Sequence, residues 1–305
     1  MTGVLIAGVA VHDFVFGLDR MPDRAEKYRA SSFAAVGGGC GANAAVAVAV
    51  LGGDALLASR LGADEVGDLI VRDLEAFGVD CSNVGRFTGR RSSLSAVLVD
   101  AAGERLIVNY RDPDLPDATD LIPDSLPRGI RAVLADTRWP AGAERAMGVA
   151  NRSGVAGILD GEAPWAGLAP ALSLASHVVF SAQGLADLTG TRDLAAGLRA
   201  ARAHAPGWLA VTDGAAGTLF LADGEVRRVP TLVVAAVDTL GAGDVWHGAF
   251  ALRLAEGARE AEAARFANVT AALKCTRFGG RAGVPTRSEV VDALAAHPLP
   301  EEAVP

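Results

Sequence analysis

Short, continuous apolar runs recur along the chain, and each ends in small or acidic residues. Runs this short that are apolar at nearly every position are typical of strands buried on both faces. They lie at 4–11, 132–137, 155–160, 177–181 and 208–214. Ala-rich segments with helical character separate them, at 41–51, 65–76, 141–153 and 193–204. The alternation predicts βαβ units and a mainly parallel sheet, with ligands beyond the carboxyl ends of its strands.

Two regions depart from this alternation. The segments 28–36 and 92–110 have the pattern of exposed antiparallel strands, and the second predicts a hairpin that turns at Ala102-Gly103. We expect the two to form a small lid sheet, with strands within 14–36 and 90–110. No linker divides the chain, so the sequence predicts one domain over residues 1–305.

The composition fits a single folded domain. Half of the 305 residues are hydrophobic, enough for one large core. No apolar run reaches the roughly 20 residues that span a bilayer, and the first residues lack the pattern of a signal peptide. We therefore expect a soluble cytoplasmic protein. The three cysteines, Cys40, Cys81 and Cys275, are widely spaced and indicate reduced thiols, with neither a disulfide framework nor a zinc site.

The formal net charge is -8. An acidic chain is a poor partner for nucleic acid, whose polyanion requires a basic face. We therefore expect small-molecule partners, with no nucleic acid and no membrane. Any anionic ligand must be held by a few local cations.

The segment 238–250, "DTLGAGDVWHGAF", carries the strongest chemical signal. It follows the strand-like run 232–237. The turn Gly241-Ala242-Gly243 lets the backbone approach a ligand, and the helix that begins near Asp244 aims N–H groups at an anion. A carboxylate in that position would repel phosphate unless it removes a proton from an attacking hydroxyl. Asp244 is thus a candidate general base. The alternative is that it only caps the helix.

Three motifs together resemble the ribokinase family, also called the PfkB carbohydrate kinases. They are "DTLGAGD" (238–244), "VGGGCGANAAVAVAVLGG" (36–53) and "VTDGAAG" (211–217). The resemblance implies a ribokinase-like α/β three-layer sandwich with a small β-sheet lid, and transfer of a phosphoryl group from ATP with Mg2+ to a sugar hydroxyl. It assigns Asp244 as the base and Gly241, Ala242 and Gly243 as the anion hole.

The same resemblance implies further contacts. Sugar hydroxyls would be held by Asp13, Gly38, Gly39 and Asn43. Nucleotide contacts would come from Thr212, Gly214, Gly217 and Asn268. Alternatively, Asn43 is an ordinary residue at the start of a helix, and Asn268 belongs to the polar face of a helix.

One departure from the family concerns the metal. Many relatives carry an NxxE motif near Mg2+, but here Ser181 and Gly184 replace its Asn and Glu. Asp160 and Glu162 are candidate metal ligands, although polar residues at a strand end are an equal alternative. Arg277 and Arg281 flank a glycine pair in a loop that in relatives passes the nucleotide or a monovalent cation, so a monovalent cation is a further candidate cofactor.

Within the family, the chain resembles most the bacterial kinases of 6-deoxy-6-sulfofructose. The stretches that carry this resemblance include "GERLIVNY" (103–110), "VLADTRW" (133–139) and "AALKCTRFGGRAGVP" (271–285). The resemblance implies phosphorylation at the C1 hydroxyl, with the sulfonate held by Lys27, Asn109 and Arg138. Ammonium, amide and guanidinium donors suit its three acceptor oxygens. Each residue also has an alternative role without a ligand. Lys27 could be a solvated lid residue, Asn109 could form a turn at a strand end, and Arg138 could belong to a surface ion pair.

Other functions remain open at this point. A ketohexokinase, fructokinase or 1-phosphofructokinase would keep the same motifs. A non-catalytic sugar sensor on the same fold would be expected to lose the base or the anion hole, and this chain keeps both. A nicotinamide oxidoreductase would place G-x-G-x-x-G after the first strand, which this chain does not. We also expect a homodimer formed through the lid.

Overall fold

A ten-stranded sheet is the centre of the fold in the computed structural model, which describes residues 2–101 and 104–304. Seven neighbouring strands, from β11 to β5, are parallel, and the edge formed by β12, β13 and β14 is antiparallel. In spatial order the strands are β14 (Glu302–Ala303), β13 (Glu225–Val229), β12 (Thr218–Ala222), β11 (Trp208–Thr212), β10 (His177–Ser181), β9 (Ala156–Gly161), β8 (Ile130–Ala135), β1 (Gly3–Ala7), β4 (Asp54–Gly62) and β5 (Asp80–Phe87).

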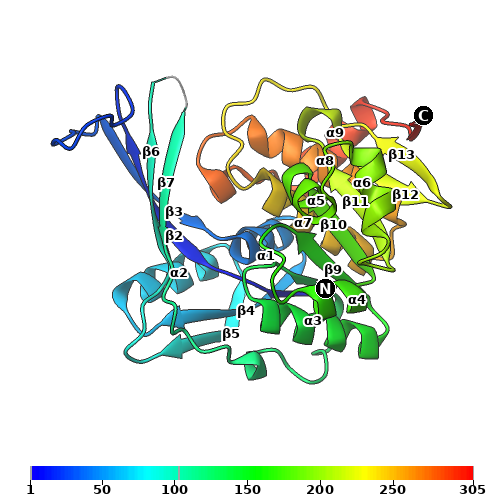
Figure 1. Ribbon diagram of the computed structural model, residues 1–305, viewed down its shortest axis with the longest axis horizontal. Coiled ribbons are helices and arrows are strands. Elements are labelled where there is room, and N and C mark those ends of the chain that lie inside the picture. The colour runs from blue at the N-terminus through cyan, green and yellow to red at the C-terminus, as the bar shows by residue number, and fades with distance from the viewer. Residues whose placement is uncertain (1, 102–103, 305) are drawn as a thin grey trace.

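Helices cover both faces of this sheet and make the expected three layers (Figure 1). One face packs against α1 (Cys40–Val50), α2 (Glu65–Ala76), α7 (Ala242–Ala255), α8 (Glu260–Cys275) and α9 (Arg287–Ala296). The other packs against α3 (Pro140–Ser153), α4 (Ala169–Leu174), α5 (Ala182–Thr189) and α6 (Leu194–Ala201). No helix in the described ranges is long and apolar enough to cross a membrane.

A second sheet of four strands stands to one side of the layers (Figure 1). Its order is β3 (Ser32–Gly38), β2 (Val11–Gly17), β6 (Leu94–Val99) and β7 (Arg105–Tyr110). The small lid sheet is thus present, and it begins at Val11 and ends its first hairpin at Gly38, slightly beyond the expected bounds. The predicted turn at Ala102-Gly103 lies outside the described residues.

The pattern located most predicted elements. The strand 177–181 and the helix 65–76 have the expected bounds. The apolar run 4–11 is not one strand, because residues 8–10 leave the sheet and the chain turns from β1 into the lid strand β2. The run 232–237 forms no strand. Four of its residues, Leu232, Val233, Val234 and Ala236, instead line a cavity described below.

Aromatic rings fill the core beneath α7. Phe250 is fully buried and stacks on Trp246 and Trp208, with ring centroids 4.8 and 5.4 Å apart. Trp208 in turn stacks on Phe220 at 5.6 Å. These contacts tie α7, whose first turn carries Asp244, to strands β11 and β12. The packing therefore fixes the position of the helix that bears the candidate base.

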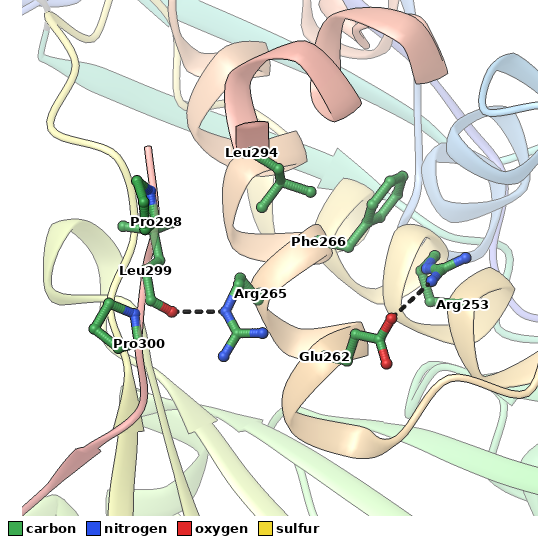
Figure 2. A pocket seen from close by; sticks show the side chains of 8 residues that line it. All are labelled: Arg253, Glu262, Arg265, Phe266, Leu294, Pro298, Leu299 and Pro300. Atoms are coloured by element: carbon green, nitrogen blue, oxygen red, sulfur yellow. Dashed lines mark hydrogen bonds and ion pairs between the residues drawn. The ribbon is translucent and has the colours of Figure 1, made fainter. Parts of the chain in front are cut away.

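The C-terminal segment closes over α8 before it adds β14 to the sheet edge. A surface cavity of 470 Å³ lies between this segment and α7, α8 and α9, and Figure 2 shows the side chains that line it. Arg265 Nε donates to the carbonyl oxygen of Leu299 at 2.6 Å, and Arg253 pairs with Glu262 at 3.3 Å. The first of these contacts ties the segment to α8, and the second joins α7 to α8.

Phe250→Ala should lower the free energy of unfolding by about 3 to 5 kcal/mol, because it leaves a cavity in the stacked cluster. Urea unfolding followed by circular dichroism measures the loss. Val291→Ala, at a half-exposed position on α9, should change it by less than about 0.5 kcal/mol. Equal losses in the two variants would mean that the ring cluster adds nothing beyond an ordinary apolar contact.

Candidate functional site

The first turn of α7 presents Asp244 to the centre of the molecule. Gly241 caps the helix with φ of 73°, a left-handed conformation that favours glycine. Asn43 Nδ2 on α1 donates to Asp244 Oδ2 at 2.7 Å, and the Cys40 thiol also donates to this carboxylate. Burial raises the pKa of Asp244, while Asn43, His247 and Cys40 oppose that rise. Side chains from another helix, α1, therefore orient this carboxylate. A residue that served only the first turn of its own helix would not need such contacts.

A second buried carboxylate lies beside it. Oxygens of Asp160 and Asp244 and Cys40 Sγ all lie within 4.8 Å of one another. His247 Nε2 is 3.5 Å from Asp160 Oδ1, while its Nδ1 is 2.8 Å from the carbonyl oxygen of Gly243. Burial raises the pKa of Asp160 to about 7, although the neighbouring imidazole opposes it. His247, which the sequence analysis did not assign, joins this carboxylate to the glycine turn.

One cavity unites all four predicted nucleotide contacts. Its volume is 310 Å³, and Thr212, Gly214, Gly217 and Asn268 line it together with Ala242 and Gly243 of the glycine turn. The apolar segment 231–236 forms another wall. A mainly apolar slot that ends at backbone N–H groups suits a base at one end and phosphates at the other. The geometry thus fits a nucleotide whose terminal phosphate meets the Gly241–Gly243 turn.

The side-chain amide of Asn268 makes four hydrogen bonds to residues around this cavity. Its Nδ2 donates to the carbonyl oxygens of Val229 and Pro230, at 2.9 and 3.2 Å. Its Oδ1 accepts from Thr218 Oγ1 and Trp246 Nε1, both at 2.7 Å. All four hydrogen-bonding positions of the amide are therefore used within the protein. Asn268 shapes the wall and has no polar group to offer a purine.

A second cavity, of 550 Å³, lies between the lid and the carboxyl ends of the strands. Gly39, Cys40, Asn109 and Arg138 line it. Cys40 also contacts Asp244, so the candidate base stands between this cavity and the nucleotide cavity. Two ligands in the two cavities would meet at the glycine turn.

Arg138 is already paired in this arrangement. Its Nη2 is 2.9 Å from Glu162 Oε2, and its Nη1 donates to the carbonyl oxygen of Ala163. Both groups belong to the segment that follows β9. Arg138 therefore forms the ion pair that the sequence suggested as an alternative role, and its side chain also lines the cavity.

Polar side chains of the lid form a chain that ends at Asp13. Asn109 Nδ2 donates to Ser95 Oγ at 3.1 Å, and Ser95 donates to the Asp13 carboxylate. Burial raises the pKa of Asp13, and the Ser95 hydroxyl opposes this. A Cβ at position 38 would lie 2.2 Å from Asp13 Oδ2, so Gly38 is required for Asp13 to occupy its place. Ser95 was missed because serine in a strand carries no distinctive signal.

The sequence pattern also did not indicate Asp136, although its carboxylate joins three segments of the site. Its Oδ2 accepts from the backbone N–H groups of Val9 and Gly41, at 2.7 and 3.0 Å. Its Oδ1 accepts from the N–H of Arg138 at 2.9 Å. One buried carboxylate thus fixes the β1–β2 bend, the start of α1 and the cavity arginine. An acidic residue directly after an apolar strand is a signal that could have indicated it.

Close packing explains the absent NxxE motif. Ser181 caps α5 by accepting from the N–H of Gly184 at 2.9 Å. A Cβ at Gly184 would lie only 2.3 Å from the carbonyl oxygen of Gly161. The end of β9 therefore occupies the space that a glutamate at 184 would need, and it brings Asp160 and Glu162 to this edge of the sheet. Carboxylate oxygens are suitable ligands for Mg2+.

Lys27 lies apart from the other predicted sulfonate contacts. It is exposed in the connection 18–31 between β2 and β3. This connection forms the outer end of the lid (Figure 1). Each of these strands has seven residues, so about 20 Å of sheet separates this end from the end near α1. Asn109 and Arg138 share a cavity that Lys27 does not line.

Comparisons with known proteins agree with this geometry. Residues 1–287 match the profile described as pfkB family carbohydrate kinase. Ribokinase from Bacillus subtilis is 29% identical over 97% of this chain and 100% of its own, and fructokinase-1 from Zea mays is 31% identical over 87% and 90%. Arabidopsis thaliana ribokinase, solved with ribose and ATP, superposes with a TM-score of 0.84 at 25% identity over 96% of this chain and 99% of its own.

Asp160→Asn tests the buried carboxylate pair. A folded-state pKa near 7 against about 4 when unfolded means that this group stabilises the fold below about pH 4, and that the benefit is lost as pH rises through 7. The amide does not titrate, so the unfolding free energy of the variant relative to wild type should rise by about 2 kcal/mol between pH 5 and 8.

Urea titrations of the metal-free protein across that range provide the measurement. The matched control is Asp187→Asn at an exposed position on α5, whose stability should follow wild type at each pH. A pH-independent difference for Asp160→Asn would contradict the assignment of the raised pKa.

Proposed function

Because the chain belongs to the pfkB family of carbohydrate kinases, we propose that this ATP-dependent sugar kinase phosphorylates 6-deoxy-6-sulfofructose at its C1 hydroxyl. The observation that carries the proposal is the shared cavity of Arg138, Asn109 and Gly39. Its lining includes the guanidinium groups of Arg111 and Arg138 and the amide of Asn109, and its Cys40 contacts Asp244. The resemblance of the flanking stretches to sulfofructose kinases supports the same acceptor.

In this proposal Asp244 removes the proton from the attacking C1 hydroxyl. Asn43 and Cys40 aim its carboxylate, and burial raises its pKa toward the range in which a base accepts a proton readily. The oxygen of C1 then attacks the γ-phosphorus as the bond to the ADP leaving oxygen breaks. Backbone N–H groups of the Gly241–Gly243 turn stabilise the charge on the transferring phosphoryl group.

The sugar hydroxyls would be held on the opposite side of the cavity. Asp13 is buried and is the end of the Asn109–Ser95 chain. Asn43 Oδ1 is buried and accepts no hydrogen bond from the part of the chain that the structure describes. A buried amide oxygen without a donor is costly, and a sugar hydroxyl would supply that donor. We assign Asp13, Gly38, Gly39 and Asn43 to the sugar.

The sulfonate would be held by Arg138 and Asn109. The guanidinium would exchange part of its pairing with Glu162 for two of the sulfonate oxygens, a geometry that arginine favours. Lys27 lies in the connection at the other end of the same sheet as Asn109, so closure of the lid as a rigid body would not bring it to this anion, and the proposal assigns the sulfonate to Arg138 and Asn109 alone. Asp160 and Glu162 would hold Mg2+, directly or through water. The ion neutralises phosphate charge when bound.

The lid also carries the proposed dimer surface. Its exposed side chains include a run of large apolar residues, which a second copy of the sheet would cover. They are Phe33, Leu106, Val108 and Tyr110, whereas Ile107 lies on the opposite face of β7 and lines the cavity. We propose a homodimer formed through this face.

A kinase of a neutral ketohexose is the alternative acceptor class. One observation favours it: Arg138 is already neutralised by Glu162. The similarity to a fructokinase is also consistent with it. Fructose, fructose 6-phosphate and sulfofructose therefore need to be compared directly.

Asp244→Asn should lower kcat by about 100-fold to 10,000-fold, because the amide keeps the shape of the carboxylate but accepts no proton. Binding of ATP and sugar should change much less. ADP release at saturating substrates gives kcat, and calorimetry gives the affinities. Asp187→Asn, an exposed carboxylate on α5, is the control. Near wild-type turnover in Asp244→Asn would leave Asp244 with only a structural role in the first turn of α7.

Arg138→Ala should separate the two acceptor classes. Loss of a desolvated partner of the sulfonate costs about 2 to 5 kcal/mol, so kcat/KM for sulfofructose should fall roughly 30-fold to several thousand-fold. The weaker activity on fructose should stay nearly constant. Fructose 6-phosphate, with one more oxygen and one more charge, should be a poorer substrate of the wild type.

The control is Arg131→Ala, which removes an exposed guanidinium from strand β8 itself. It should leave all three sugars unaffected. Equal losses on sulfofructose and fructose in Arg138→Ala would assign Arg138 to the fold. A wild-type preference for fructose or fructose 6-phosphate would replace the sulfosugar by that acceptor.

A further inference from the structure

Lys274 is a fully buried lysine in the last turn of α8. Its Nζ donates to the carbonyl oxygen of Asp238 at 2.9 Å and lies 3.7 Å from Asp238 Oδ2. A lysine ammonium without water is costly unless it is paired and hydrogen-bonded. This one meets both the carbonyl and the carboxylate of one residue, directly before the segment 239–243.

Asp238 in turn connects two loops. Its Oδ1 accepts from the N–H of Leu240 at 2.9 Å, and its Oδ2 accepts from the N–H groups of Gly279 and Gly280, at 3.1 and 2.9 Å. Burial alone would raise the pKa of this carboxyl, but the N–H donors and Lys274 hold it below its ordinary value. The carboxylate thus joins the approach to the glycine turn to the loop after α8.

Both of these loops belong to the nucleotide side of the site. The N–H groups of Val237 and Asp238 donate to the carbonyl oxygen of Cys275, at 2.7 and 3.1 Å. Thr239 and Cys275 line the 310 Å³ cavity. The buried Lys274–Asp238 pair therefore fixes the spacing between the cavity wall and the anion hole.

A monovalent cation does not fit this junction. The loop of Gly279 and Gly280 is the one in which the sequence resemblance allowed such an ion. The carboxylate there already has a buried ammonium as its counter-ion. A second positive charge a few ångströms from it would be repelled strongly in a poorly hydrated site.

We propose that the Lys274 ammonium is a built-in counter-ion that positions the anion-hole turn, so that the kinase needs no monovalent metal cation. Lys274 acts through Asp238 and is a positioning residue. The proposal rests on the ATP-dependent kinase activity and on no particular sugar, so failure of the sulfosugar assignment would leave it intact.

The test compares wild type with Lys274→Ala in buffers whose only added monovalent cation is tetramethylammonium, K+ or NH4+. ADP is detected directly, with whichever tested sugar is turned over fastest, so that no coupling enzyme contributes its own cation requirement. Wild-type kcat should vary by less than about 2-fold among the buffers. Lys274→Ala should lose about 10-fold to 100-fold in tetramethylammonium and regain at least about 5-fold in K+ or NH4+.

Melting temperature gives a second readout that requires neither sugar nor turnover. NH4+ or K+ should raise that of Lys274→Ala by several degrees and leave that of the wild type unchanged. The matched control is Arg277→Met, which removes a cation of the same loop that pairs with Glu289 and not with Asp238. It should show no response to the cations.

Activation of the wild type by more than about 5-fold in K+ would overturn the proposal, and this measurement holds even if Lys274→Ala does not fold. A folded Lys274→Ala that keeps wild-type kcat in tetramethylammonium would overturn it too. A folded variant that is impaired but indifferent to every cation would assign Lys274 to the fold alone and would equally overturn it.

Discussion

Buried carboxylates that are satisfied by backbone N–H groups hold this site together. Removing a carboxylate from water is costly unless several donors replace the lost hydration. Asp136 collects N–H groups from the β1–β2 bend, from α1 and from the end of β8. Asp238 does the same for the glycine turn and for the loop after α8. Because each carboxylate requires all of its donors, the segments that supply them cannot move independently.

The two cavities follow from this constraint. The hydrogen bonds of Asp136 fix the positions of the lid and of α1 on either side of the cavity that Arg138 and Asn109 line. The Asp238 junction sets the walls around the nucleotide cavity. Asp244 lies where the two meet, held by Asn43 from one side and by the packed helix α7 from the other. Two ligands bound in these cavities would be held on either side of one carboxylate, which is the arrangement that transfer of a phosphoryl group between them requires.

Local sequence pattern was sufficient for the parts of the fold that depend on local rules. Apolar runs indicated the central strands, and the glycine motifs predicted a nucleotide site whose residues Thr212, Gly214 and Gly217 line one cavity. The pattern failed where an apolar run serves another purpose. Residues 232–234 and 236 line a pocket, and the run 4–11 is broken by the bend that Asp136 holds. Neither role can be predicted from the residues of the run itself, because the residues that it contacts lie far away in the sequence.

The sequence by itself determined the family, the α/β layers with their lid, and the glycine turn with its aspartate, since each is written in contiguous residues. Only the tertiary structure decided how the charges are distributed. It paired Arg138 with Glu162, buried Lys274 against Asp238 and set Lys27 at the outer end of the lid. The physical reason is that an ionic side chain's role depends on its burial and on its nearest opposite charge. Packing between distant segments fixes both.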